Sequence, residues 1–128
     1  MVDTTSSTSA VGSGDEEAPV DLDWLRECTD NDADVMNTML EMYFTRTRTM
    51  LDEMEKAIAA GTPAEVRRLG HACVGSSSTC GMVKLAALFK ELERKGVAGT
   101  VEGAAEITAQ ARVEYARSKD FIDRTINR

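Results

Sequence analysis

The sequence contains one histidine, His71, and the residues beside it make it the strongest candidate for chemistry in the chain. An exposed imidazole is ordinarily neutral in large part at physiological pH, so one ring nitrogen is available as a nucleophile. Four residues later, Gly75 interrupts a helical pattern, although a glycine inside a helix costs about 0.5–1 kcal/mol relative to alanine. The missing side chain at this spacing clears space beside the ring. Together, His71 and Gly75 predict a site at which a bulky group approaches the imidazole.

The residues around His71 are predicted to divide between two faces of one helix over residues 63–80. The face opposite the histidine forms an apolar core stripe, made of Val66, Leu69, Cys73, Ser76 and Cys80. The face of the histidine itself carries Arg67, Arg68, Val74, Gly75 and Ser78. We therefore expect His71 to point towards solvent or a partner.

This helix has the clearest start signal in the chain. Thr62, Pro63 and Glu65 predict a capping box with proline at the first helical position. Gly81 is a candidate for the residue just beyond the end of the helix. These signals favour a rigid helix as the support of the histidine.

Other chemistries fit the sequence poorly. Cys73 and Cys80, seven residues apart, would lie about 10.5 Å apart along the helix axis, too far for one metal ion or one disulfide. The serine run after Gly75 lacks the Lys-Ser/Thr of a phosphate-binding loop, and Ser76 faces away from His71, which argues against a serine hydrolase. We expect no metal site and interpret the two cysteines as small core residues.

The remaining chain predicts further helices and no strand pattern. A short helix is expected from about Leu22 to Cys28, capped by Asp21, and a long one after cap candidates Asp30 and Asn31. The others are expected over residues 82–96, ended by Gly96, and from Gly99-Thr100 to about 126. Short connections favour antiparallel neighbours, so the predicted fold is all-α: an antiparallel up-and-down four-helix bundle with a short extra N-terminal helix.

Composition limits the possible functions. The 128 residues are 42% hydrophobic and 29% charged, with a net charge of −7, which suits one globular domain and argues against nucleic-acid binding. No apolar run is long enough to span a membrane. Residues 1–19 are acidic and rich in Ser and Thr, and we expect them to form a disordered tail before a bundle over residues 20–128. With no secretion signal and an odd number of cysteines, a cytoplasmic location is expected.

The run from His71 to Ser77, followed by Cys80-Gly81-Met82, resembles the signature of the histidine-containing phosphotransfer (HPt) domain. That signature has a histidine, two residues, usually a lysine, then Gly-Ser and a later glycine. Leu85, Leu88, Leu92-Glu93 and Gly96 match the helix that follows in the family, and the resemblance covers about residues 20–126. The family's four-helix bundle with a short N-terminal helix agrees with the predicted layout.

The resemblance implies a phosphocarrier and not an enzyme with its own substrate pocket. His71 would accept a phosphoryl group from the aspartyl phosphate of a receiver domain and pass it to another receiver aspartate. The implied partners are receiver domains of response regulators or of a hybrid histidine kinase. Mg²⁺ would belong to the partner receiver, and this chain, expected to be a monomer, would need no cofactor.

One departure from the family pattern concerns charge. Val74 stands where the family usually has lysine, three residues after the histidine. Arg67 and Arg68, on the face of the histidine, and Lys84, early in the next helix, are the candidates to replace that cation. The alternative hypothesis is a helical adaptor that docks receiver domains or other helices without carrying phosphate.

Overall fold

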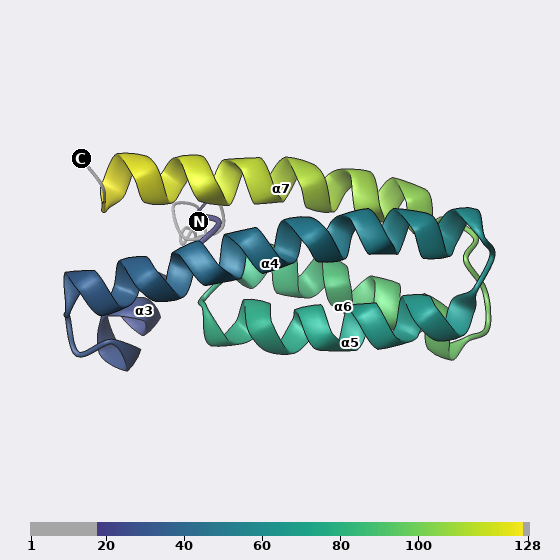
Figure 1. Cartoon of the computed structure of the whole chain (residues 1–128), viewed down its shortest axis with the longest axis horizontal. Coiled ribbons are helices and arrows are strands. Elements are labelled where there is room, and N and C mark those ends of the chain that lie inside the picture. The colour runs from purple at the N-terminus through teal and green to yellow at the C-terminus, as the bar shows by residue number, and fades with distance from the viewer. Residues whose placement is uncertain (1–17, 127–128) are drawn as a thin grey trace, which may run out of the picture.

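The structure, a computed structural model, describes residues 18–126 as helices joined by short turns (Figure 1). Five helices are present in this range and no strand: α3 (Leu22–Cys28), α4 (Ala33–Ala59), α5 (Pro63–Thr79), α6 (Val83–Val97) and α7 (Ala104–Thr125). The prediction of an all-α bundle with a short N-terminal helix is confirmed. The predicted tail lies outside the described residues, apart from Ala18 and Pro19.

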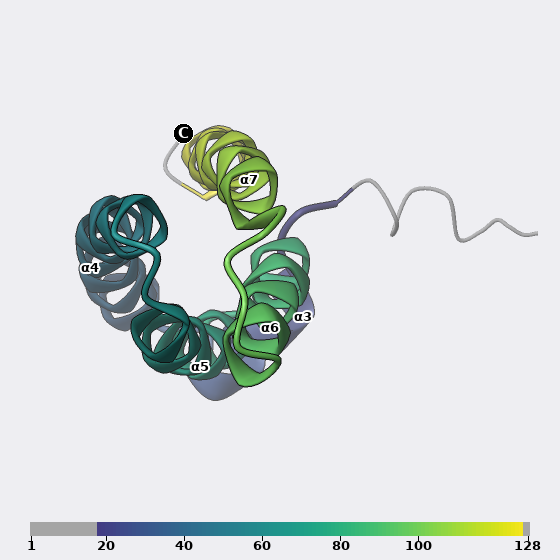
Figure 2. The ribbon, with the colours of Figure 1, turned by 90° about the vertical axis from the view of Figure 1, so that its right-hand side faces the viewer.

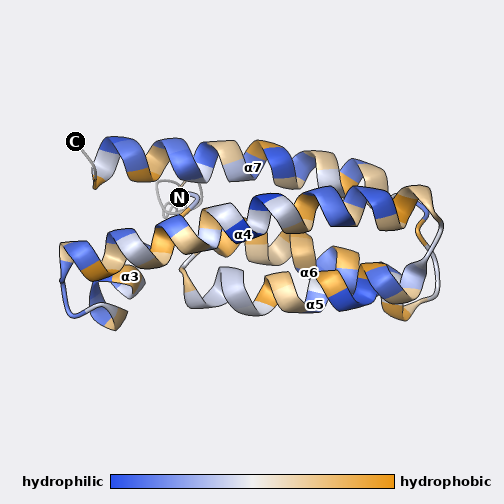
Figure 3. Cartoon of the chain, viewed as in Figure 1, coloured by the Kyte–Doolittle hydropathy of each residue, from blue (hydrophilic) through white to orange (hydrophobic). Residues whose placement is uncertain are grey.

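The four long helices run antiparallel to their neighbours and enclose one core (Figures 1 and 2). Helix α5 lies between α4 and α6 and makes its most extensive contact with α6, while α7 contacts both α4 and α6. Each helix combines hydrophilic and hydrophobic residues (Figure 3), as amphipathic helices around a core must. None of the described helices is long and apolar enough to cross a membrane.

Helix α3 closes one end of the bundle. The Asp21 side chain caps it by accepting a hydrogen bond from the Trp24 backbone N–H, as predicted. Leu25 is fully buried, whereas Trp24 is half-exposed and donates from its ring nitrogen to the Thr79 carbonyl at 2.9 Å. Trp24 therefore ties α3 to the end of α5 and is not part of the core.

The cap of α4 differs from the prediction. Asp32 is the N-cap residue, and Asp30 and Asn31 form the preceding turn with φ of 56° and 59°. Asp and Asn tolerate this left-handed conformation better than most residues do. The Asp32 carboxylate accepts hydrogen bonds from the backbone N–H groups of Asp34 and Val35.

The predicted capping box of α5 is wrong. Pro63 does occupy the first turn, but the Thr62 hydroxyl donates back to the Ala57 carbonyl at 3.0 Å. The Glu65 carboxylate pairs with Arg68 instead of returning to the cap. Gly81, with φ of +71°, follows the end of the helix as expected.

The core stripe of α5 also differs at one position. Ser77, not Ser76, is fully buried, and its hydroxyl lies 2.7 Å from the Tyr43 hydroxyl of α4. Four residues after Cys73, Ser77 continues the buried row along the helix. Ser76 is half-buried at the edge of the α4–α5 interface. The other predicted core positions are buried, namely Val66, Leu69, Cys73 and Cys80.

Gly96 does not end its helix, because α6 continues to Val97. A Cβ atom at Gly96 would overlap the backbone of Arg67, and one at Gly70 would lie 2.8 Å from the Glu93 backbone nitrogen. The two glycines therefore let the backbones of α5 and α6 approach closely. This contact places α6 directly beside the turn of α5 that carries His71.

Candidate functional site

His71 is displayed on the surface of α5, away from the core. Its side chain is 79% exposed, as the helical periodicity predicts. The helix supporting it is anchored by fully buried residues on the opposite face, among them Leu69 and Cys73. The imidazole is therefore accessible to another molecule, while the backbone below it is fixed.

The imidazole is oriented by a carboxylate from α6. Nδ1 of His71 lies 2.8 Å from Oε2 of Glu93, whose side chain is 23% exposed. An ionised carboxylate only accepts hydrogen bonds, so the nitrogen facing it carries the proton. In the neutral ring the lone pair then belongs to Nε2. The contact supports Nε2 as the nucleophilic atom of the site.

Glu93 was not among the residues that the sequence predicted for the site. It follows the core residue Leu92 and, taken alone, is one of many charged residues in the chain. Its role depends on how closely α5 and α6 pack. The signal in the sequence was the pair Gly70 and Gly96, whose missing side chains bring the Glu93 backbone against α5.

The surface beside the ring is open at Gly75. A Cβ atom built there would meet nothing within 4 Å, so the glycine is not required for packing inside the protein. Ser78 lies further along α5 and is also exposed. Val74 is half-buried and packs against the hydrophobic core, so only part of it is available to a partner.

The three candidates to replace the usual lysine differ in their partners and in their position relative to His71. Arg68 forms a two-pronged ion pair with Glu65, with distances of 2.9 and 2.6 Å. Arg67 is exposed, and within residues 18–126 it forms no ion pair. The structure does not bring Lys84 to this face. It precedes Glu93 by nine residues, about half a turn around α6, and lines a groove between α6 and α7 with Leu88 and Val113.

Cys73 of α5 and Cys80, the C-cap residue of that helix, are buried in the core. Burial raises the pKa of the Cys73 thiol to about 12 and that of Cys80 to about 11. Both therefore stay protonated at physiological pH, whereas a metal ligand or nucleophile needs the thiolate. No group of three or more possible ligands lies together in residues 18–126.

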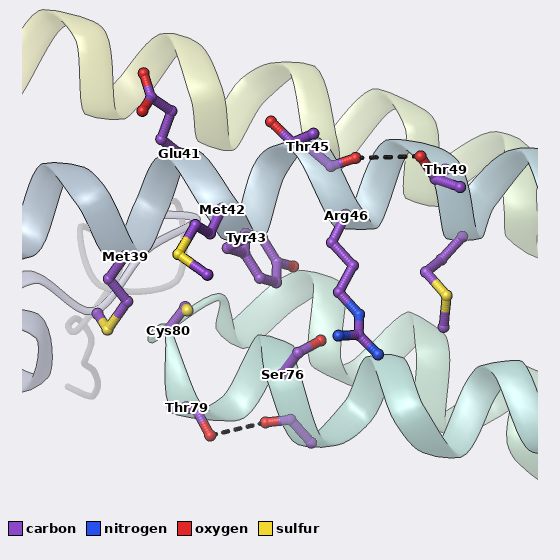
Figure 4. Close-up of a pocket in the computed structure, with 12 residues that line it drawn as sticks. Met39, Glu41, Met42, Tyr43, Thr45, Arg46, Thr49, Ser76, Thr79 and Cys80 are labelled. Carbon is purple, nitrogen blue, oxygen red and sulfur yellow. Dashed lines mark hydrogen bonds between the residues drawn. The ribbon is translucent and has the colours of Figure 1, made fainter.

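A groove runs between α4 and α5 on the side of Gly75 (Figure 4). Its volume is about 1010 Å³, and its walls include Met39, Met42 and Met50 of α4 and Gly75, Ser76 and Thr79 of α5. Met42 is 67% exposed, and Val35, one turn before Met39 on the same helix, is 50% exposed. The groove thus offers a largely apolar surface that begins one turn from the histidine, with Glu41 and Arg46 also in its lining.

Comparisons with known proteins agree with the helical fold. The family model described as "Hpt domain" matches residues 38–120. The chain also resembles the crystal structure of histidine-containing phosphotransfer protein B from Pseudomonas aeruginosa PAO1, with a TM-score of 0.80 and 23% sequence identity. That match covers 87% of this chain and 96% of the other, and it shows a shared fold. A comparison with curated proteins finds no significant match.

Proposed function

Because this chain belongs to the Hpt domain family, we propose that it is a phosphocarrier of a cytoplasmic two-component phosphorelay with His71 as the phosphoacceptor. The observation that carries the proposal is the pairing of His71 with Glu93. It leaves Nε2 exposed on a rigid helix, beside the open surface at Gly75. Such an arrangement suits an imidazole that must enter the active site of another protein.

In the proposed step the Nε2 lone pair attacks the phosphorus of an aspartyl phosphate on a receiver domain. The N–P bond forms as the bond from phosphorus to the aspartate oxygen breaks, and the aspartate leaves as a carboxylate. The imidazole ring gains positive charge, while its Nδ1 proton stays against the carboxylate of Glu93. Glu93 thus orients the ring and stabilises the charge that develops on it.

The rest of the catalytic apparatus would come from the receiver. Phosphoryl transfer depends mainly on in-line positioning and on neutralising charge. A receiver-bound Mg²⁺ would supply much of that charge, so the proposal requires no cofactor held by this chain. The return step, to an aspartate of a second receiver, is the same reaction in reverse.

We propose that the receiver contacts the apolar surface of α4 that borders the groove. Val35 and Met42 are exposed there and Met39 is half-buried, and flexible methionines adapt to more than one partner. The surface continues to Gly75 through the groove (Figure 4). A receiver seated on it would bring its aspartate towards His71, and two different receivers could use the same surface in turn.

The experiment that tests this proposal is incubation with phosphorylated receiver domains, followed by a search for label that is lost in acid and kept in base. Phosphohistidine behaves in this way and phosphoserine does not. Label on the unaltered protein that disappears in His71→Gln is the expected result. Binding of receivers without any label would support the alternative, a helical adaptor, which is favoured by Val74 at the position where the family usually has lysine.

A further inference from the structure

We propose that Arg46 of α4 is the cation that contacts the phosphoryl group on His71, in the role that the lysine usual at position 74 would otherwise have. The inference deepens the proposed phosphotransfer function and rests on it. It concerns a residue on a neighbouring helix, in a part of the sequence outside the segment that resembles the HPt signature.

The position of Arg46 is the first observation. It lines the groove between α4 and α5 together with Gly75 and Ser76 (Figure 4). Its side chain extends from α4 to α5, so that the guanidinium lies beside α5 near Ser76. Its charge is also close enough to Cys73, two residues after His71, to oppose the effect of burial on that thiol's pKa. The guanidinium therefore lies alongside the segment of α5 that directly follows the histidine.

The second observation is that Arg46 has no ion-pair partner among the residues that the structure describes. Other arginines are held by carboxylates: Arg68 by Glu65, and Arg112 by both Asp52 and Glu55. Within residues 18–126, Arg46 forms neither an ion pair nor a hydrogen bond with another side chain. Glu41 lines the same groove but forms no ion pair with Arg46 among residues 18–126. A guanidinium that lines a groove without an ion-pair partner is suited to an anion that arrives later.

The third observation is the open surface at Gly75, which lies one turn after the histidine and lines the same groove as Arg46. Gly75 leaves the surface clear on the side of α5 that faces the groove. A phosphoryl group on Nε2 would extend outwards from a ring that is 79% exposed. Rotation of the long arginine side chain across Gly75 then brings its donors to the phosphoryl oxygens, whereas Val74, half-buried and apolar, offers none.

The test uses the whole protein and a chemical phosphoryl donor, so that it does not depend on a partner. Phosphoramidate transfers its phosphoryl group to Nε2 with release of ammonia. The ³¹P shift of the product is then followed against pH, because a nearby cation favours the doubly charged phosphoryl group and lowers its pKa. We expect Arg46→Gln to raise that pKa by about half a unit or more, and Arg46→Lys to restore part of the difference.

Arg48→Gln is the matched control, because Arg48 lies on the same helix but lines a groove towards α7 with Tyr115 and Lys119. It should leave the phosphoryl pKa unchanged. Equal values for Arg46→Gln and the unaltered protein would overturn the role of Arg46, while label passed from a phosphorylated receiver to His71 would still uphold the proposed function. If the unaltered protein takes no phosphoryl group, from phosphoramidate or from receivers, both proposals are overturned.

Discussion

Nδ1 of His71 lies 2.8 Å from Oε2 of Glu93, and this contact joins the exposed face of α5 to the neighbouring helix. It exists because the backbones of the two helices approach closely at Gly70 and Gly96. The close packing of α5 against α6 engages Nδ1 and leaves Nε2 as the nitrogen available for reaction. The packing of α5 against α6 therefore determines which nitrogen of His71 is available for the proposed reaction.

Replacing Glu93 tests that relationship. Glutamine offers both a donor and an acceptor, so Glu93→Gln should no longer hold the ring in one tautomer. ¹⁵N shifts of the imidazole should show a mixture, and transfer from a phosphorylated receiver should slow roughly fivefold to tenfold, equivalent to about 1–1.4 kcal/mol in the barrier. Glu91→Gln, an exposed position on the same helix, is the control. Unchanged tautomer and rate in Glu93→Gln would remove the positioning role.

The acceptor itself is tested by His71→Gln. The side chain is 79% exposed and contributes nothing to the core, so we expect the unfolding free energy to change by less than about 0.5 kcal/mol. Circular dichroism should remain helical, while phosphohistidine should be absent, since the chain has no second histidine. Acid-labile, base-stable label persisting on this variant would contradict the assignment.

Much of the fold could be predicted from the sequence because its signals are local. The apolar periodicity and terminal signals such as Asp21 and Pro63 depend on neighbours within a few residues. The cap of α4 was misplaced by one or two residues within a single turn, at Asp32, and other errors arose where a second element decided the outcome. From the sequence alone, Gly96 is predicted to end its helix. In the structure it lies inside α6, where Arg67 of α5 occupies the space that a side chain at this position would need.

The site could be predicted only in part for the same reason. His71 and Gly75 share one helix, and their spacing alone indicates that they are neighbours. Glu93 and Arg46 reach the same region from α6 and α4. Their proximity depends on how the helices are aligned against one another, and the periodicity of a single helix does not predict that alignment.

The two glycines of α5 should respond oppositely to alanine. At Gly75 a Cβ atom meets nothing within 4 Å, so Gly75→Ala should stabilise the helix by up to about 1 kcal/mol while slowing transfer. Gly70→Ala would press against the Glu93 backbone and should destabilise the fold by about 1–3 kcal/mol. Urea unfolding of both variants measures the difference. A Gly75→Leu variant that transfers at the unaltered rate would show that the open surface has no part in the reaction.

Stability should fall in alkaline solution because of the buried thiols. Free thiols in the unfolded chain ionise near pH 9, whereas burial raises the pKa of Cys73 to about 12 and of Cys80 to about 11. Between pH 9 and 11 the folded state therefore holds more protons, and the unfolding free energy should drop by up to about 1.4 kcal/mol per pH unit for each thiol. Burial also raises the pKa of Tyr43, which adds to the loss above pH 10.

Cys73→Ala separates this effect from general alkaline damage. The variant should be less stable at pH 8, because it leaves a cavity in the core, yet its stability should fall less steeply as the pH rises. Urea unfolding at pH 8, 9 and 10.5 gives both slopes. Parallel curves for the two proteins would exclude the Cys73 thiol as a source of the pH dependence.

Position 74 lacks the positive charge that the family usually has there. Val74→Lys would place an ammonium one turn beyond His71 on the same side of α5, within reach of a phosphoryl group on the ring. It should lengthen the lifetime of the phosphorylated form. A loss of stability is also expected, because Val74 packs against the core. If the valine instead contacts the receiver, the same change should weaken receiver binding and slow transfer in both directions.

Hydrolysis of the isolated phosphoprotein and receiver affinity, measured on the same variant, distinguish these two roles of Val74. Arg67→Ala and Arg68→Ala complete the comparison. Arg68 is already held by Glu65, so any charge that α5 adds to that of Arg46 should come from Arg67. Arg67→Ala should therefore shorten the phosphohistidine lifetime more than Arg68→Ala does. If none of these three substitutions, nor Arg46→Gln, changes lifetime, affinity or transfer, this face of α5 is not the phosphotransfer site, and a receiver-binding adaptor becomes the better account of the protein.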